Sequence, residues 1–291
     1  MRLLALLLVV ATPLAVQAAQ AVPAPRSALV DPPRDQAHPA HNQQLLIPSH
    51  GVGMNAFLFE ASGTGPHPTV ILMHGLPGNE RNLDLAQAMR RAGWDVLTFT
   101  YRGAWGSPGD FSIGGSFEDT AAALDFARSP EGAALGIDPR HIVLAGHSMG
   151  GTTAALTAAN AQGLNGLILI DAWNIADDAP PKGAPRAELI KGFDDYGNSL
   201  HGASPESTVD EVIAKGAQWN LVEAAAHFKG LPVLTVTAKY AGAESNRPVT
   251  AAMRTAGARV SAVELNSDHS FADHRLELAA VVVGWLQRLK R

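Results

Sequence analysis

A single serine is surrounded by glycines in the segment GHSMGG at residues 146–151. Gly146 lies two residues before Ser148, and Gly150 lies two residues after it. The apolar run HIVLAG, typical of a buried strand, leads into this segment, and small residues typical of a helix follow it. Glycines at this spacing let the strand and the helix approach closely around a sharp turn that lifts the serine hydroxyl above the sheet edge. The pattern predicts that Ser148 is a nucleophile.

A second glycine motif, HGLPG at residues 74–78, directly follows the apolar run HPTVILM. A serine that attacks a carbonyl carbon needs two backbone N–H donors for the negative oxygen of the tetrahedral intermediate. The helix after the serine begins with Met149, whose amide is one candidate donor. The amide of Leu76 in the earlier motif is the natural second donor. We therefore expect Leu76 and Met149 to form an oxyanion hole.

Four segments carry a resemblance to a known family: HGLPG (74–78), TYRGAWGSPG (100–109), GIDPRHIVLAGHSMGG (136–151) and SDHSFADHR (267–275). The chain resembles the α/β-hydrolases, and among them the serine esterases and the prolyl-oligopeptidase-like or dienelactone-hydrolase-like branches. The resemblance extends over most of the chain from residue 68 onward. It implies a catalytic serine, acid and histidine in that chain order, with no metal and no organic cofactor.

Two histidines near the C-terminus can supply the base that this order requires. His269 follows the predicted strand VSAVEL through a short polar turn, where the family carries its histidine on a loop. His274 instead opens the last predicted helix. The two are five residues apart and would not share one helical face as metal ligands. We expect His269 to be the general base.

The acid departs from the family pattern. Relatives carry an aspartate a few residues after the strand that corresponds to LPVLTVTA, and direct counting places Ala241 there. A loop about three residues longer gives this role to Glu244, which we take as the acid. The alternative is Asp171, at the end of the preceding predicted strand. Asp268 is adjacent to the histidine and poorly placed to face its ring.

Apolar runs alternate with helical patterns along most of the chain. Strands are predicted at 43–48, 54–61, 67–73, 95–101, 141–146, 164–171, 231–238 and 260–265, and helices at 82–92, 117–127, from 149, at 248–256 and at 274–289. Strict alternation predicts an α/β fold with a mostly parallel central sheet flanked by helices. Nearly sixty residues separate Asp171 from Leu231, which predicts a helical cap insertion at about 174–229, with helices near 208–215 and 217–227. Tyr101 and Trp173, beside these strand ends, are expected to border the substrate pocket.

The N-terminus has the features of an export signal. Residues 1–21 combine one arginine, an apolar run and small residues at possible cleavage positions, and 22–41 contain five prolines typical of an unstructured tether before the hydrolase domain at 42–291. We expect a periplasmic or secreted protein with no membrane span in the mature chain. Without Arg2 the chain has 21 basic and 27 acidic residues, a net charge of −6, which argues against a nucleic-acid partner.

The chain contains no cysteine, so disulfides, thiol nucleophiles and cysteine-bound metals are excluded. The expected reaction is hydrolysis of a small carboxylic ester through an acyl-enzyme. Two alternatives stay open: a peptidase or amidase of the prolyl-oligopeptidase-like type, and a catalytically silent hydrolase fold that binds a ligand or partner.

Overall fold

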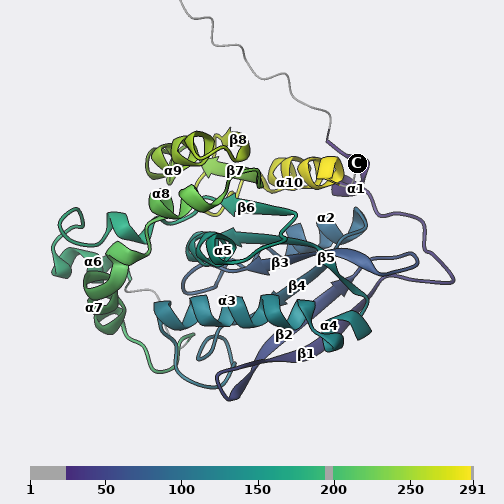
Figure 1. Cartoon of the computed structure of the whole chain (residues 1–291), viewed down its shortest axis with the longest axis horizontal. Helices are drawn as coiled ribbons and strands as arrows, with labels where there is room; N and C mark the ends of the chain where they lie inside the picture. The colour runs from purple at the N-terminus through teal and green to yellow at the C-terminus, as the bar shows by residue number, and fades with distance from the viewer. Residues whose placement is uncertain (1–23, 194–198, 290–291) are drawn as a thin grey trace, which may run out of the picture.

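A computed structural model describes residues 24–193 and 199–289. An eight-stranded sheet runs through its centre in the order β1-β2-β4-β3-β5-β6-β7-β8 (Figure 1). β1 pairs with β2 and β2 with β4 in antiparallel fashion, whereas every pair from β4 to β8 is parallel. The predicted mostly parallel sheet is confirmed. The predicted signal peptide at 1–21 lies outside the described residues.

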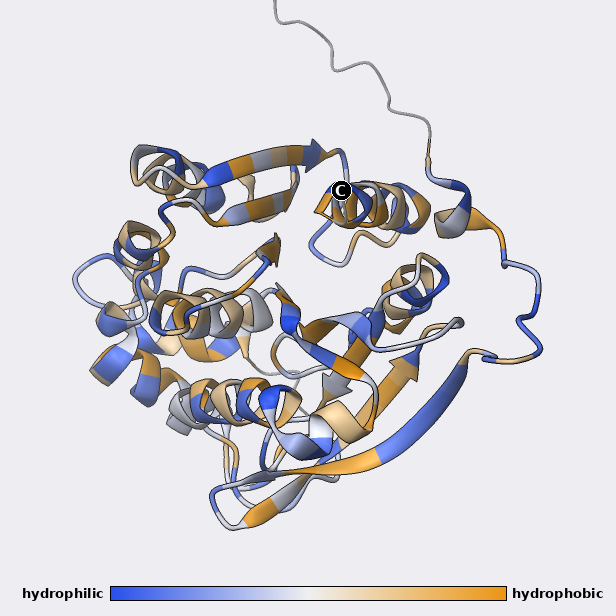
Figure 2. Cartoon of the chain, turned by 45° about the vertical axis from the view of Figure 1, so that its right-hand side comes forward, coloured by the Kyte–Doolittle hydropathy of each residue, from blue (hydrophilic) through white to orange (hydrophobic). Residues whose placement is uncertain are grey.

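The strands follow the apolar runs closely. They span His41–Ser49 (β1), Val52–Glu60 (β2), His67–Met73 (β3), Asp95–Phe99 (β4), Ile137–His147 (β5), Gly166–Ile170 (β6), Pro232–Ala238 (β7) and Arg259–Leu265 (β8). Every residue of β6 is buried, as expected for a parallel strand that is covered on both faces. Figure 2 shows the corresponding concentration of hydrophobic residues on the central strands.

Helices cover both faces of the sheet. One face packs against α3 (Ile113–Arg128), α5 (Met149–Asn160), α8 (Leu221–Ala224) and α9 (Ala243–Thr255), and the other against α1 (Arg26–Leu29), α2 (Leu83–Arg91) and α10 (Arg275–Leu289). The short α4 (Pro130–Ala134) links α3 to β5. Among the described residues, no helix has the length and apolar character needed to cross a bilayer.

The segment at 22–41 was expected to have little fixed structure, but its described part contains a short helix. Residues 26–29 form α1, which contacts α2 and α10. Ala28 is buried there, and the Arg91 guanidinium of α2 donates to the carbonyls of Ser27 (3.1 Å) and Ala28 (3.1 Å). The prolines of this segment did not indicate a helix. The helix depends instead on tertiary contacts: the burial of Ala28 and the two hydrogen bonds from Arg91.

Helical segments fill the long connection between β6 and β7. They are η1 (Ile175–Asp177), α6 (Arg186–Gly192), α7 (Pro205–Lys215), η2 (Gly216–Gln218), α8 and η3 (Ala225–His227), and Figure 1 shows α6 and α7 at one end of the sheet. The Glu211 carboxylate of α7 accepts from the amides of Ile113 (2.8 Å) and Gly114 (3.1 Å). A carboxylate at these free N–H groups caps α3 and fastens the inserted segment to the main domain.

Candidate active site

Ser148 occupies a strained turn between β5 and α5. Its backbone has φ 56° and ψ −123°, a region that residues with a side chain rarely adopt. A Cβ atom at Gly146 would collide with the carbonyl of Gly150, and one at Gly150 would collide with the carbonyl of Met73. The two glycines therefore serve the close approach that their spacing predicts. The turn presents Ser148 at the C-terminal end of β5, half-buried beside the end of β6.

The HGLPG loop lies directly against this turn. A Cβ atom at Gly75 would come within 2.9 Å of the Ser148 Cβ atom, so the loop and the serine are in close contact. The amide of Met149 begins α5 and has no acceptor within that helix. Within the described part of the chain, the Leu76 amide donates to no backbone carbonyl. Both amides expected in the oxyanion hole thus flank the serine and are free of backbone acceptors.

His269 lies on the loop between β8 and α10, and its partner is Asp171. The ring Nδ1–H donates to Asp171 Oδ2 over 2.6 Å. The Asp171 side chain has no exposed surface, whereas that of His269 is 46% exposed. A buried carboxylate on Nδ1 fixes the tautomer that leaves Nε2 free to accept a proton and stabilises the imidazolium once it forms.

The prediction that Glu244 is the acid facing His269 is wrong. Glu244 is exposed in the first turn of α9, because that helix begins at Ala243 and includes Pro248 rather than starting at the proline. The end of β7 and the residue before α9 contribute backbone amides instead of an acid: Ala238 N–H donates to Asp171 Oδ1 (2.9 Å) and Gly242 N–H to Oδ2 (3.2 Å). Asp171, the alternative, is the carboxylate that faces His269.

His147, which the sequence reasoning did not single out, links the serine turn to the histidine loop. Its Nε2–H donates to the carbonyl of His269 over 2.8 Å, and the two ring centroids are 4.6 Å apart. Burial, followed by repulsion from a charged His269, lowers the pKa of His147 to about 4, so the ring is neutral at pH 7. The chain neighbour of Ser148 therefore holds His269 beside the serine turn. The sequence feature that could have indicated His147 is its position inside the GHSMGG motif, directly before Ser148.

A cavity of about 570 Å³ opens above Ser148. Leu76, Pro77 and Asn79 form the wall on the loop side, and residues of α6 and its flanks form the opposite wall. Trp173, predicted to border the pocket, lines it, and its indole N–H donates to Asp178 (2.6 Å). The inserted segment therefore supplies half of the pocket.

Tyr101, predicted to border the same pocket, is instead a core residue. It has no exposed surface, and its hydroxyl donates to the carbonyl of His74 over 3.1 Å. Burial raises the pKa of the phenol. Tyr101 thus supports the start of the HGLPG loop and cannot contact a substrate, because its side chain is fully buried.

A family comparison agrees with this geometry: the model of the alpha/beta hydrolase family matches residues 70–281. The chain belongs to this family. Relatives are detected over shorter stretches. The quorum-quenching protein AidA of Acinetobacter baumannii (strain MDR-ZJ06) is 34% identical over 118 residues, which are 38% of each chain. An uncharacterised protein of Mycobacterium tuberculosis is 29% identical over 117 residues, 40% of each chain. The chain thus spans about two fifths of the length of these relatives.

Solved structures of similar fold include several enzymes named as esterases. The thermophilic carboxylesterase EstE1 from a metagenomic library superimposes with a TM-score of 0.63 at 21% identity, over 84% of the hydrolase and 89% of EstE1. The Pyrobaculum calidifontis esterase gives a TM-score of 0.66 at 19% identity, over 91% and 88%. Est1E from Butyrivibrio proteoclasticus gives 0.63 at 19%, over 85% and 98%. At these identities the likeness establishes the fold.

Proposed function

We propose that the hydrolase cleaves carboxylic esters through a covalent acyl-enzyme. The observation that carries the proposal is the His269–Asp171 pair, which His147 fastens to the strained turn that presents Ser148. A serine, a buried carboxylate and a histidine in this chain order form a nucleophile with its orienting acid and its base.

In the proposed reaction, His269 Nε2 takes the proton of the Ser148 hydroxyl as its oxygen attacks the ester carbonyl carbon. The amides of Leu76 and Met149 stabilise the oxyanion, which collapses as the alcohol leaves with the proton from His269. Water then attacks the acyl-serine, with His269 again as base, and the carboxylic acid departs. The Asp171 carboxylate stabilises the imidazolium in both steps.

The pocket above Ser148 supports a small substrate with an apolar group. Its walls include Leu76, Pro77, Trp173, Leu189 and Phe193, and the rings of Trp173 and Phe193 lie 5.9 Å apart. An acyl or aryl group of modest size would bury its surface between these side chains. We further propose export of the protein, on the basis of residues 1–21. N-terminal sequencing of protein recovered from the periplasm of an expressing bacterium should then begin at Ala19 or Val22.

A substrate panel tests the activity. p-Nitrophenyl acetate, butyrate and octanoate are compared with the p-nitroanilides of alanine and proline, using the wild type and Ser148→Ala. We expect ester turnover with a preference for the shorter chains, and a loss of roughly four to six orders of magnitude in kcat/KM in the variant. Faster cleavage of the anilides would indicate a peptidase, and absence of turnover on every substrate would indicate a silent fold; both outcomes contradict the proposal.

A further inference from the structure

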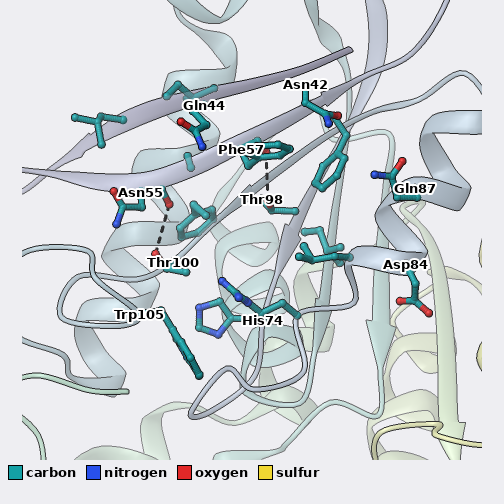
Figure 3. A pocket seen from close by; sticks show the side chains of 18 residues that line it. Asn42, Gln44, Asn55, Phe57, His74, Asp84, Gln87, Thr98, Thr100 and Trp105 are labelled. Carbon is teal, nitrogen blue, oxygen red and sulfur yellow. Dashed lines mark hydrogen bonds between the residues drawn. The ribbon is translucent and has the colours of Figure 1, made fainter. Parts of the chain in front are cut away.

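A second and larger cavity lies on the other side of the HGLPG loop. This groove of about 930 Å³ is formed by one face of β1, β2 and β4 together with the start of α2, and Ser148 is not among its lining residues (Figure 3). The HGLPG loop separates the two cavities: Leu76 and Pro77 line the cavity at Ser148, and His74 lines the groove. The esterase chemistry leaves the groove unexplained.

Aromatic side chains form the floor and one end of the groove. Phe57 is half-buried on β2, and the buried ring of Phe59 on the same strand meets it edge-on, with the ring centroids 4.8 Å apart. Trp105 is 38% exposed at the end of the groove. Its orientation is fixed, because the indole N–H donates to the carbonyl of Pro77 (2.8 Å) and the Arg81 guanidinium lies 5.3 Å from its ring centroid. These rings offer flat apolar surfaces to a ligand.

Neutral amide side chains surround this floor. Gln44 of β1, Asn55 of β2 and Gln87 of α2 line the groove (Figure 3). Within residues 24–193 and 199–289, none of these three amide groups has a hydrogen-bond partner. Buried His74 adds an acceptor at the inner end: its Nδ1–H donates to Gly75 O (2.7 Å), which leaves the Nε2 lone pair without a donor.

This combination restricts the chemistry of a ligand. An anion would meet one guanidinium, and a cation would meet only the Asp84 carboxylate, which already pairs with Arg275. A purely apolar ligand would remove water from the amides without pairing them, which is unfavourable. A peptide strand cannot pair with the sheet here, because the groove is on its face and the backbone of β2 is already paired with β1 and β4.

A neutral carbohydrate satisfies every part of the groove. Each sugar ring has an apolar C–H face that packs on an aromatic ring, and hydroxyls that both donate to and accept from carboxamides. We propose that the groove binds one or more neutral sugar units, stacked on Phe57 and Trp105 and hydrogen-bonded to Gln44, Asn55 and Gln87. The site is separate from Ser148, so the inference does not depend on the esterase proposal.

Nuclear magnetic resonance on the full chain tests this inference. Maltotriose, cellotriose and xylotriose are titrated into ¹⁵N-labelled Ser148→Ala protein, with octanoate and acetyl-trialanine amide as comparison ligands. We expect saturable shifts of the Gln44 and Asn55 side-chain amides and of the Trp105 indole with at least one sugar. The double variant Gln44→Ala/Asn55→Ala should weaken binding at least tenfold, since each lost hydrogen bond removes about 1 kcal/mol. Gln162→Ala, an exposed amide elsewhere, is the matched control and should bind as before.

Three results would overturn the carbohydrate site: no saturable shift with any of the sugars, sugar shifts that survive the double variant unchanged, or preferential binding of octanoate or the peptide. Fluorophosphonate labelling is measured in parallel on the wild type and on the Gln44→Ala/Asn55→Ala double variant, both with Ser148 intact. This labelling reports on Ser148 alone. In the double variant, retained labelling with lost sugar binding supports the groove. Wild-type protein that binds sugar but is not labelled contradicts only the esterase proposal.

Discussion

At the scale of single residues, three N–H donors fix the Asp171 carboxylate: the imidazole of His269 and the amides of Ala238 and Gly242. A side chain at position 242 would collide with the carboxylate, so a glycine there belongs to the acid site. These bonds hold the carboxylate against Nδ1 of His269. In the proposed mechanism this carboxylate orients the imidazole and stabilises its charged form.

Removal of this carboxylate should be far more damaging than removal of the acid on α9. We expect Asp171→Ala to lower kcat/KM for p-nitrophenyl butyrate by roughly three to four orders of magnitude, because the imidazole loses its tautomeric and electrostatic support. Glu244→Ala, in the exposed first turn of α9, should leave kcat/KM close to that of the wild type. Circular dichroism establishes that both variants are folded. A severe loss in Glu244→Ala alone would reverse the assignment.

The acid illustrates why residue roles are harder to predict than motifs. Ser148 and His269 follow from local patterns, since a glycine turn and a loop after the last strand are visible in the chain itself. The ends of β6 and β7 are neighbours in the sheet, so an acid at either end can reach the same imidazole. Counting along the sequence cannot distinguish them. The contacts of the Asp171 carboxylate with the Ala238 and Gly242 amides become visible only in the folded chain.

At the scale of elements, His147 joins the end of β5 to the loop between β8 and α10. We expect His147→Leu to lower kcat for p-nitrophenyl butyrate about 10- to 100-fold with a smaller change in KM, because the base loses its position relative to Ser148. His147→Gln retains an N–H donor at a similar reach and should recover most of the activity. Equal losses in kcat for the two variants would show that this hydrogen bond does not position His269.

Elements were predictable where burial imposes a pattern. The apolar runs of β3, β5, β6 and β7 placed these strands, since a strand covered on both faces must be apolar throughout. Element starts were less predictable: α9 begins before its proline, and α1 depends on contacts with α2 and α10 that are distant in sequence. The direction of the Tyr101 side chain was not predictable either. Its place at a strand end beside the pocket did not reveal that the side chain points into the core.

At the scale of the whole molecule, two buried neutral histidines make the fold sensitive to acid. Burial lowers the pKa of His74 to about 4, and burial together with repulsion from His269 does the same for His147. Both would titrate near pH 6.5 in the unfolded chain. The unfolded state therefore binds more protons between these values, so stability is fully present above about pH 6.5 and falls as the pH decreases toward 4.

Urea unfolding measured across this range checks the effect. Each histidine should withdraw at most about 3 kcal/mol of unfolding free energy between pH 6.5 and 4. His147→Gln should show a shallower decrease than the wild type, and His227→Gln, which changes an exposed histidine, should show the wild-type slope. A free energy of unfolding that is level from pH 6.5 to 4 would contradict the neutral, buried state of these rings.

The most direct test of an activated Ser148 is its reaction with a fluorophosphonate, followed by mass spectrometry of the digested protein. The account predicts a single phosphonylated residue, Ser148, with labelling that is abolished in Ser148→Ala and strongly slowed in Asp171→Ala. An unlabelled Ser148 in folded wild-type protein, or a label on a different residue, would contradict it.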